Sequence, residues 1–225
     1  MSDSKIAFLF DLDGTLIDSV YQHVLAWREA LEQMGMALSA WRVHRRVGMS
    51  GGLISAALQR ETGRPVSAQT GQRLQDLHTK CYLKHVKDIR ALPGAKDLLA
   101  LLTKQKVPWA IATSSSLERA RHALKLLGVG KNIPVVTRDD VKRGKPDPDL
   151  FLQAARNLHV DIGVCVVVGD SVWDLLAARR AKALGVGLLS GGYGEDELVQ
   201  AGAYRVYQDP ADLLSHLDEI GIRVE

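Results

Sequence analysis

The sequence predicts an α/β fold in which a mostly parallel sheet is covered by helices on both faces and carries an inserted helical module. The first observation is that short segments rich in Val and Ile alternate with amphipathic segments from residue 95 onward. Such alternation is typical of parallel strands that are joined by helices. The second observation is an apolar first segment, Ile6–Phe10, which predicts a buried strand but is followed by helical periodicity alone through residues 19–85.

The inserted module is expected to contain four helices. Apolar residues recur at helical spacing from Val20 to Leu31, and Gly35 then ends the pattern. No strand signal interrupts the stretch that follows. The expected helices cover residues 19–34, 39–47, 50–62 and 67–85.

The rest of the chain is expected to complete one sheet. The first strand must join it, because a segment this apolar needs cover on both faces. We therefore predict a Rossmann-like core domain of residues 1–17 and 90–225, and a cap domain of residues 18–89, with crossings near 15–18 and 86–92. The expected strands are 107–113, 133–137, 164–168, 185–189 and 204–207, and the expected helices are 95–105, 117–127, 147–158, 172–183 and 211–219.

Composition excludes several classes of protein. The chain has 225 residues and a net charge of +3, without a dense basic run, so no nucleic-acid partner is expected. The two cysteines fall in different elements, and the seven histidines form no ligand pattern, which argues against a disulfide framework or a zinc site. No apolar run reaches membrane-spanning length, and Asp3 and Asp11 interrupt the start too early for a signal peptide. A cytoplasmic protein without a membrane partner is predicted.

Polar side chains cluster where the predicted strands end. Asp11 and Asp13 leave the first strand on the same face, because side chains at i and i+2 of a strand point the same way. Thr113, Lys145 and Asp170 follow the other strands. Ligands of parallel sheets bind beyond the carboxyl ends of the strands, so a functional site is expected here. An Asp-Gly turn is the simpler interpretation of Asp13, but the following segment is helical rather than a second strand.

Four ordered motifs resemble those of the haloacid dehalogenase-like (HAD) superfamily. They are Asp11-Leu12-Asp13-Gly14-Thr15, Thr113-Ser114, Gly144-Lys145-Pro146-Asp147, and Gly169-Asp170-Ser171 with Asp174. The inserted helices resemble the cap of the subgroup that contains phosphoglycolate phosphatase and β-phosphoglucomutase. This resemblance covers the whole chain. It implies a Mg²⁺-dependent phosphatase that acts on a small phosphorylated metabolite through an aspartyl-phosphate.

The resemblance also implies roles for the motif carboxylates. Asp11 fits a nucleophile that takes the phosphoryl group. Asp13 fits the general acid to the leaving alcohol and then the base for water, and the like charge of Asp11 is expected to raise its pKa. Asp11, Asp170 and the backbone carbonyl of Asp13 would hold Mg²⁺, which prefers oxygen ligands. Asp174 could support the metal or merely cap a helix with Ser171, and both interpretations stay open.

Phosphate recognition is assigned in the same way. Thr113 and the Ser114 backbone N–H would bind phosphoryl oxygens, although hydroxyl residues at this point could also simply start a helix. Lys145 would contact the phosphoryl group. In the cap, Arg45, Arg46 and Gly51 are candidates for contact with the rest of the substrate.

Alternative activities follow from the same motifs. Asp13 favours a phosphatase or a phosphomutase over a dehalogenase, which lacks the second carboxylate. The resemblance to β-phosphoglucomutase is weakened at Gly51, where that enzyme carries an arginine. A phosphomutase that uses the same intermediate and a phosphate-binding regulatory module without turnover remain alternatives. The sequence specifies neither the substrate nor the oligomeric state.

Overall fold

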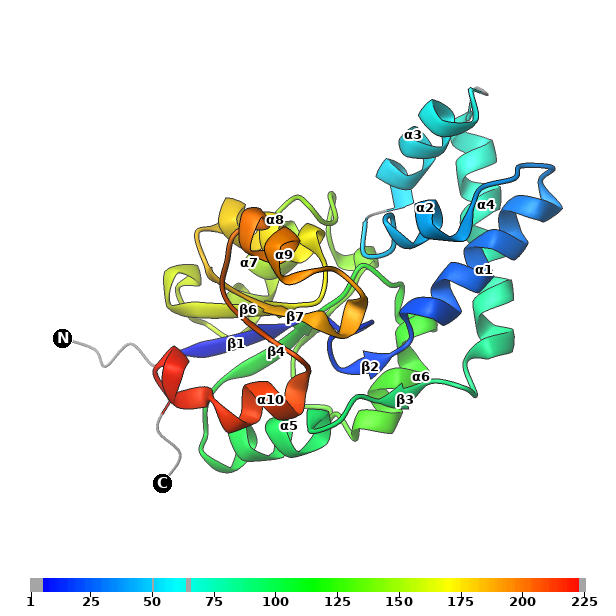
Figure 1. The fold of residues 1–225 in the computed structure, drawn as a ribbon. Helices are drawn as coiled ribbons and strands as arrows, with labels where there is room; N and C mark the ends of the chain where they lie inside the picture. The colour runs from blue at the N-terminus through cyan, green and yellow to red at the C-terminus, as the bar shows by residue number, and fades with distance from the viewer. Residues whose placement is uncertain (1–5, 50, 64–65, 223–225) are drawn as a thin grey trace.

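The computed structural model describes residues 6–49, 51–63 and 66–222 and shows a six-stranded parallel sheet flanked by helices (Figure 1). The predicted α/β class is confirmed. The strand order is β5-β4-β1-β6-β7-β8, so the first strand lies in the interior of the sheet. The strands are β1 (Ala7–Phe10), β4 (Trp109–Ala112), β5 (Val135–Val136), β6 (Cys165–Gly169), β7 (Leu184–Leu188) and β8 (Ala203–Tyr207).

Alternation of side chains along β1 explains the two helical layers. Phe8 and Phe10 point to the face covered by α5, α6 and α10, while Ala7 and Leu9 point to the face covered by α7 and α8. All four side chains are fully buried because helices cover both faces, and β4 and β6 pair with β1 on its two edges. The helices are α5 (Ala95–Lys104), α6 (Leu117–Leu127), α7 (Asp149–Asn157), α8 (Val172–Ala181), α9 (Glu195–Ala201) and α10 (Pro210–Ser215). Short 3₁₀ helices are η1 (Arg138–Asp140), η2 (Ile162–Val164), η3 (Leu189–Gly191) and η4 (Leu217–Ile220).

Element boundaries differ from prediction where local chemistry ends a strand or helix. The strand expected at 133–137 shrinks to Val135–Val136, because Thr137 becomes the N-cap of η1 and accepts from Asp139 N. The helix expected at 211–219 begins at Pro210 and breaks at His216 before η4. Helix α9 was not predicted, since its seven residues carry too few apolar positions for a clear period.

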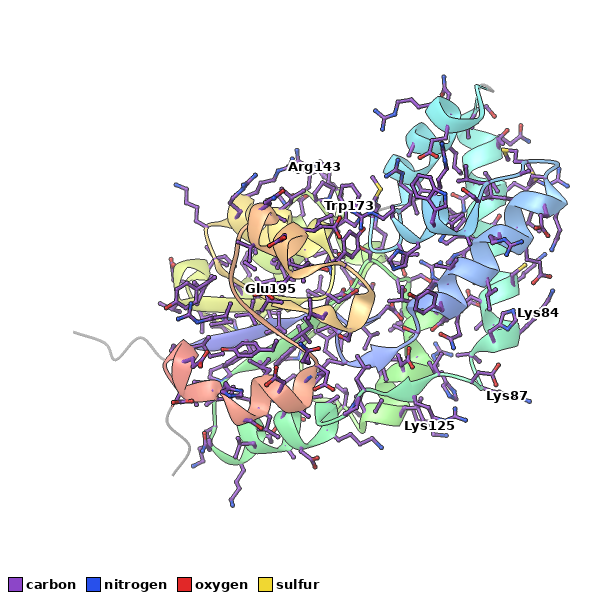
Figure 2. The ribbon with its side chains drawn as sticks, in the orientation of Figure 1. Lys84, Lys87, Lys125, Arg143, Trp173 and Glu195 are labelled. Carbon is purple, nitrogen blue, oxygen red and sulfur yellow. The ribbon has the colours of Figure 1, made fainter. Side chains whose placement is uncertain are left out.

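Helices α1 (Val20–Gln33), α2 (Ala40–His44), α3 (Gly51–Thr62) and α4 (Ala68–His85), which we call the cap, gather beside the carboxyl end of the sheet (Figure 1). The cap has its own apolar cluster, which includes Trp27, Leu31 and Leu74. Trp173 of α8 packs against this cluster and lies at the border between core and cap (Figure 2). The assignment of residues 18–89 to a separate domain stays a prediction.

The two connections between cap and core form a small ladder that was not predicted. Strands β2 (Ile17–Asp18) and β3 (Arg90–Ala91) pair antiparallel, with Ile17 opposite Ala91 and Asp18 opposite Arg90. Two-residue strands leave no periodic signal in a sequence, so only the structure shows that both expected crossings meet. Each connection is held by the other.

Two further expectations concern cysteines and membranes. Cys81 and Cys165 are both free and buried. Along the described part of the chain, no helix combines the length and the apolar character that crossing a bilayer requires.

The central strand generates the first prediction. Leu9→Ala should lower the free energy of unfolding by about 2–5 kcal/mol, because Leu9 is fully buried and its removal leaves a cavity against the α7–α8 layer. Chemical denaturation with fluorescence detection measures the change. Leu184→Ala is the control, since Leu184 is 38% exposed and should cost less than about 1 kcal/mol. Equal losses in the two variants would contradict the layer assignment.

Candidate active site

The carboxyl ends of neighbouring strands bring the predicted motif residues together. Asp11 follows β1 and its N–H donates to Val168 O of β6 at 2.9 Å. Thr113 follows β4, Asp170 follows β6, and Lys145 comes from the loop before α7. All four of these side chains are buried. Segments that lie far apart in sequence therefore converge on Asp11.

Lys145 is the cation of this group. Its side chain is fully buried, its Nζ contacts Asp11 Oδ1, and it lies 2.7 Å from Asp174 Oδ1. Burial alone would lower the pKa of Lys145, but the carboxylates of Asp11 and Asp174 outweigh it and raise this pKa. Burial raises the pKa of Asp11 to about 7 although Lys145 opposes the shift. The single positive charge of Lys145 thus neutralises only part of the negative charge of the neighbouring carboxylates.

Three buried carboxylates form an acidic cluster beside Lys145. Asp11, Asp170 and Asp174 each offer one oxygen, and these oxygens lie within 4.8 Å of one another. Asp170 Oδ1 accepts from Thr15 Oγ1 at 2.8 Å, and burial together with Asp174 and Asp11 raises the pKa of Asp170 well above its usual value. Buried oxygens with excess negative charge are the donor set that Mg²⁺ prefers. The residues present therefore fit the expected metal.

Asp174 serves two neighbours with its two oxygens. Its Oδ2 accepts from the backbone N of Ser171 at 3.1 Å and from Ser171 Oγ at 2.5 Å, which caps α8. Its Oδ1 is buried, faces Lys145 and accepts no directed hydrogen bond. The two interpretations of Asp174 are thus compatible, because capping uses one oxygen and leaves the other toward the cluster.

Asp13 points away from the acidic cluster into a polar pocket under the cap. It accepts from Ser19 Oγ at 2.7 Å and from Ser115 Oγ at 2.9 Å, and His23 Nε2 lies 3.2 Å from its Oδ1. Burial would raise the pKa of Asp13, but His23 and the two hydroxyls outweigh it and hold this pKa well below the usual range. The expectation that Asp11 raises this pKa was wrong, because His23 was not foreseen.

A histidine pair is the feature that sequence reasoning missed. His23 Nδ1 lies 3.1 Å from His78 Nε2, and both rings are buried. Tyr82 stacks on His23 with centroids 4.0 Å apart, and Trp27 stacks on His78 at 4.1 Å. The two histidines are 55 positions apart, so no ligand spacing signals them. Helical periodicity could have placed His23 on the buried face of α1, since it lies between Val20 and Trp27.

The hydroxyl residues after β4 have distinct partners. Thr113 Oγ1 accepts from Ser115 N at 3.0 Å and is buried near Asp11. Ser114 Oγ donates to Gly48 O of the cap at 2.9 Å. The turn after β4 thus connects the predicted phosphoryl-binding position to the cap.

The structure does not bring the predicted cap arginines to this site. Arg45 pairs with Glu197 of α9, and Arg46 Nη2 lies 2.5 Å from Glu61 Oε1 within the cap. Neither lines the pocket over Asp11, because each guanidinium is held by a glutamate. Gly51 begins α3, and its neighbour Ser50 lies outside the described residues.

A pocket between core and cap gives access to Asp11 and Asp13. Its walls include Thr113, His78 and Arg119. The space open to centres of water-sized molecules is about 60 Å³. A polar cavity of this volume can hold water or a small ligand. A small ligand fits this space.

The candidate site residues thus lie at the carboxyl edge of a parallel sheet, beside a helical cap. Comparison with known proteins agrees. The family model for haloacid dehalogenase-like hydrolases matches residues 7–182, and the chain belongs to this family. It is therefore a hydrolase, and the sequence resemblance is confirmed.

Three similar proteins illustrate the relationship. Hexitol phosphatase A of Escherichia coli is 34% identical over 77% of this chain and 78% of its own length. Phosphoglycolate phosphatase of Neisseria meningitidis is 34% identical over 86% of this chain and 83% of its own. The crystal structure of a hydrolase from Pseudomonas syringae is 54% identical, covers 97% of this chain and 100% of its own, and has a TM-score of 0.94.

The acidic cluster generates a pH-dependent prediction. In metal-free protein, Asp170→Asn should increase stability, and the gain should grow as pH rises from about 4 toward neutrality. The raised pKa keeps a proton on folded Asp170 that the unfolded chain has already released, so wild-type stability falls over this range. Asparagine has no proton to lose and keeps an oxygen for Thr15. Urea unfolding in chelator, at several pH values, measures the difference.

Saturating Mg²⁺ is the control for this prediction. The wild type should then be the more stable protein, because the ion binds the folded carboxylate cluster and not the unfolded chain. If the variant and the wild type have the same free energy of unfolding at every pH, with and without Mg²⁺, the cluster is not a metal site whose carboxylates repel one another.

Proposed function

We propose that the protein is a Mg²⁺-dependent phosphatase that hydrolyses a small phosphomonoester through a phosphorylated Asp11. The observation that carries the proposal is the buried arrangement of Asp11 between Lys145 and the acidic cluster, at the mouth of a small pocket. The names of the two phosphatase relatives support the reaction class.

In the first step, an Asp11 oxygen attacks phosphorus and the bond to the ester oxygen breaks. Lys145 holds the attacking carboxylate in place, and Thr113 lies where its hydroxyl can donate to a phosphoryl oxygen. When bound at Asp11, Asp170, Asp174 and the Asp13 carbonyl, Mg²⁺ would neutralise charge on the transferring group. The departing alcohol oxygen takes a proton from the pair formed by Asp13 and His23.

In the second step, water attacks phosphorus and the bond to Asp11 breaks, which releases inorganic phosphate. The pair of Asp13 and His23, which gave a proton to the alcohol in the first step, takes a proton back from the attacking water. His23, whose Nε2 lies 3.2 Å from Asp13 Oδ1, stabilises the charge on Asp13 and passes the proton to it. The alcohol and phosphate balance the ester and water consumed.

The experiment that tests the proposal uses Asp11→Asn. This change removes the nucleophile but keeps the shape, so phosphate release from a panel of phosphomonoesters with Mg²⁺ should fall by at least about 10³-fold. Circular dichroism and thermal melting show whether the variant is folded. Unchanged turnover in a folded variant would refute the mechanism. Transfer of the phosphoryl group to a second sugar hydroxyl without phosphate release would identify a phosphomutase instead.

The role of His23 gives a separate prediction. His23→Gln should slow hydrolysis of alkyl phosphates by about 10–100-fold, because their poor leaving groups need a proton. It should affect p-nitrophenyl phosphate much less, since nitrophenolate leaves without one. Steady-state kinetics on both substrates measure the ratio. Arg28→Gln, on the exposed face of the same helix, is the control and should change neither rate.

Equal losses of His23→Gln on the two substrates would contradict this role. They would indicate that His23 supports the fold of the cap rather than proton transfer to the leaving group.

A further inference from the structure

Arg119 is a charged residue of the pocket that the mechanism does not use. It is the third residue of α6, directly after the turn that carries Thr113 and Ser115. Its side chain lines the pocket together with Asp13, His23 and His78. Its Nη1 donates to Thr79 Oγ1 of the cap at 2.9 Å. The guanidinium therefore spans the border between core and cap.

No carboxylate among the described residues forms an ion pair with this guanidinium, and its buried Nε has no hydrogen-bond partner. Burial lowers the pKa of Arg119, although the charges of Asp13 and Asp139 oppose the shift. Buried charges in proteins are normally paired. Arg45 and Arg46, by contrast, each have a glutamate.

The other arginine of the pocket is already engaged. Arg138 Nη1 donates to Val141 O at 2.5 Å, and its Nη2 donates to Lys142 O at 3.1 Å. His78 carries no charge to share with a ligand, since burial holds its pKa well below the usual value. Among the described residues that line the pocket, Arg119 is thus the arginine that keeps a donor without a partner.

The position of Arg119 relative to Asp13 indicates which part of a substrate it meets. In the proposed mechanism the phosphoryl group belongs at Asp11, and the ester oxygen belongs beside the pair formed by Asp13 and His23. The alcohol portion then extends into the remaining space of the pocket, where Arg119 and the cap residue Gln75 lie. In a cavity of about 60 Å³ that also borders Asp11, a carboxylate takes less room than a second phosphate group.

We propose that Arg119 is a specificity-determining residue that binds a carboxylate on the alcohol portion of the substrate. The substrate is then the phosphomonoester of a small hydroxy acid rather than of a neutral polyol. This inference rests on the proposed phosphatase function. Because Arg119 also donates to Thr79, the carboxylate binds where the cap and the core meet.

The test compares two substrates that differ mainly in one group. In 2-phosphoglycolate the carbon beside the ester carries a carboxylate, and in 2-hydroxyethyl phosphate it carries a neutral CH₂OH. Wild-type kcat/KM with Mg²⁺ should favour 2-phosphoglycolate by about 10–100-fold, as expected for a charge-assisted hydrogen bond to a buried group. Arg119→Met should lower this ratio about tenfold or more, and Arg119→Lys should retain part of it.

Arg121→Met is the matched control. Arg121 lies on the same helix but is exposed and does not line the pocket, so its loss removes the same net charge without changing the site. The substrate ratio of this variant should equal that of the wild type. A purely structural role of Arg119 would lower both rates together and leave the ratio unchanged.

The outcomes separate this inference from the function on which it rests. Hydrolysis of both substrates without preference for 2-phosphoglycolate, or a preference that survives in Arg119→Met, overturns the inference and leaves the phosphatase intact. Absence of hydrolysis of these substrates and of p-nitrophenyl phosphate with Mg²⁺ overturns the proposed function itself.

Discussion

A fully buried ammonium group, held between two buried carboxylates, is the constraint on which the rest of this structure depends. Removing charges from water costs several kcal/mol for each ion, so Lys145 is tolerable only if Asp11 and Asp174 are both in place. Asp11 directly follows β1, whereas Asp174 lies in the first turn of α8, the helix after β6. The pairing of β1 with β6 and the loop before α7 therefore have to place these three side chains within contact distance, since otherwise a buried charge is left without a partner.

The two motif carboxylates of β1 obtain different properties from different surroundings. Asp11 faces other acids and has its pKa raised to about 7, whereas Asp13 faces an imidazole and two hydroxyls and has its pKa lowered. The core supplies the environment of Asp11, and the cap supplies His23 to Asp13. Opposite shifts at neighbouring acids are a recurrent basis for separate chemical roles. Here the lowered pKa of Asp13 depends largely on His23, which belongs to the inserted helices rather than to the sheet.

Much of this arrangement follows from the sequence, because buried strands and their polar exits are local patterns. The sheet, the four cap helices and the convergence of Asp11, Thr113, Lys145 and Asp170 were predicted in this way. The contact of His23 with His78 was not, since it depends on how α1 packs on α4. Likewise, the partners of Arg45 and the unpaired state of Arg119 are set by the position of the cap against the core, which no local pattern encodes.

The ladder of β2 and β3 has a consequence for how such a molecule can change over evolutionary time. Because Asp18 and Arg90 are paired neighbours, the chain leaves the core and returns to it at one place, the β2–β3 ladder. The connection to the core can therefore stay the same when the inserted segment changes. Lengthening, shortening or replacing the cap would change the surroundings of Asp13, which His23 of the cap contacts, and would leave the contact of Lys145 with Asp11 within the core.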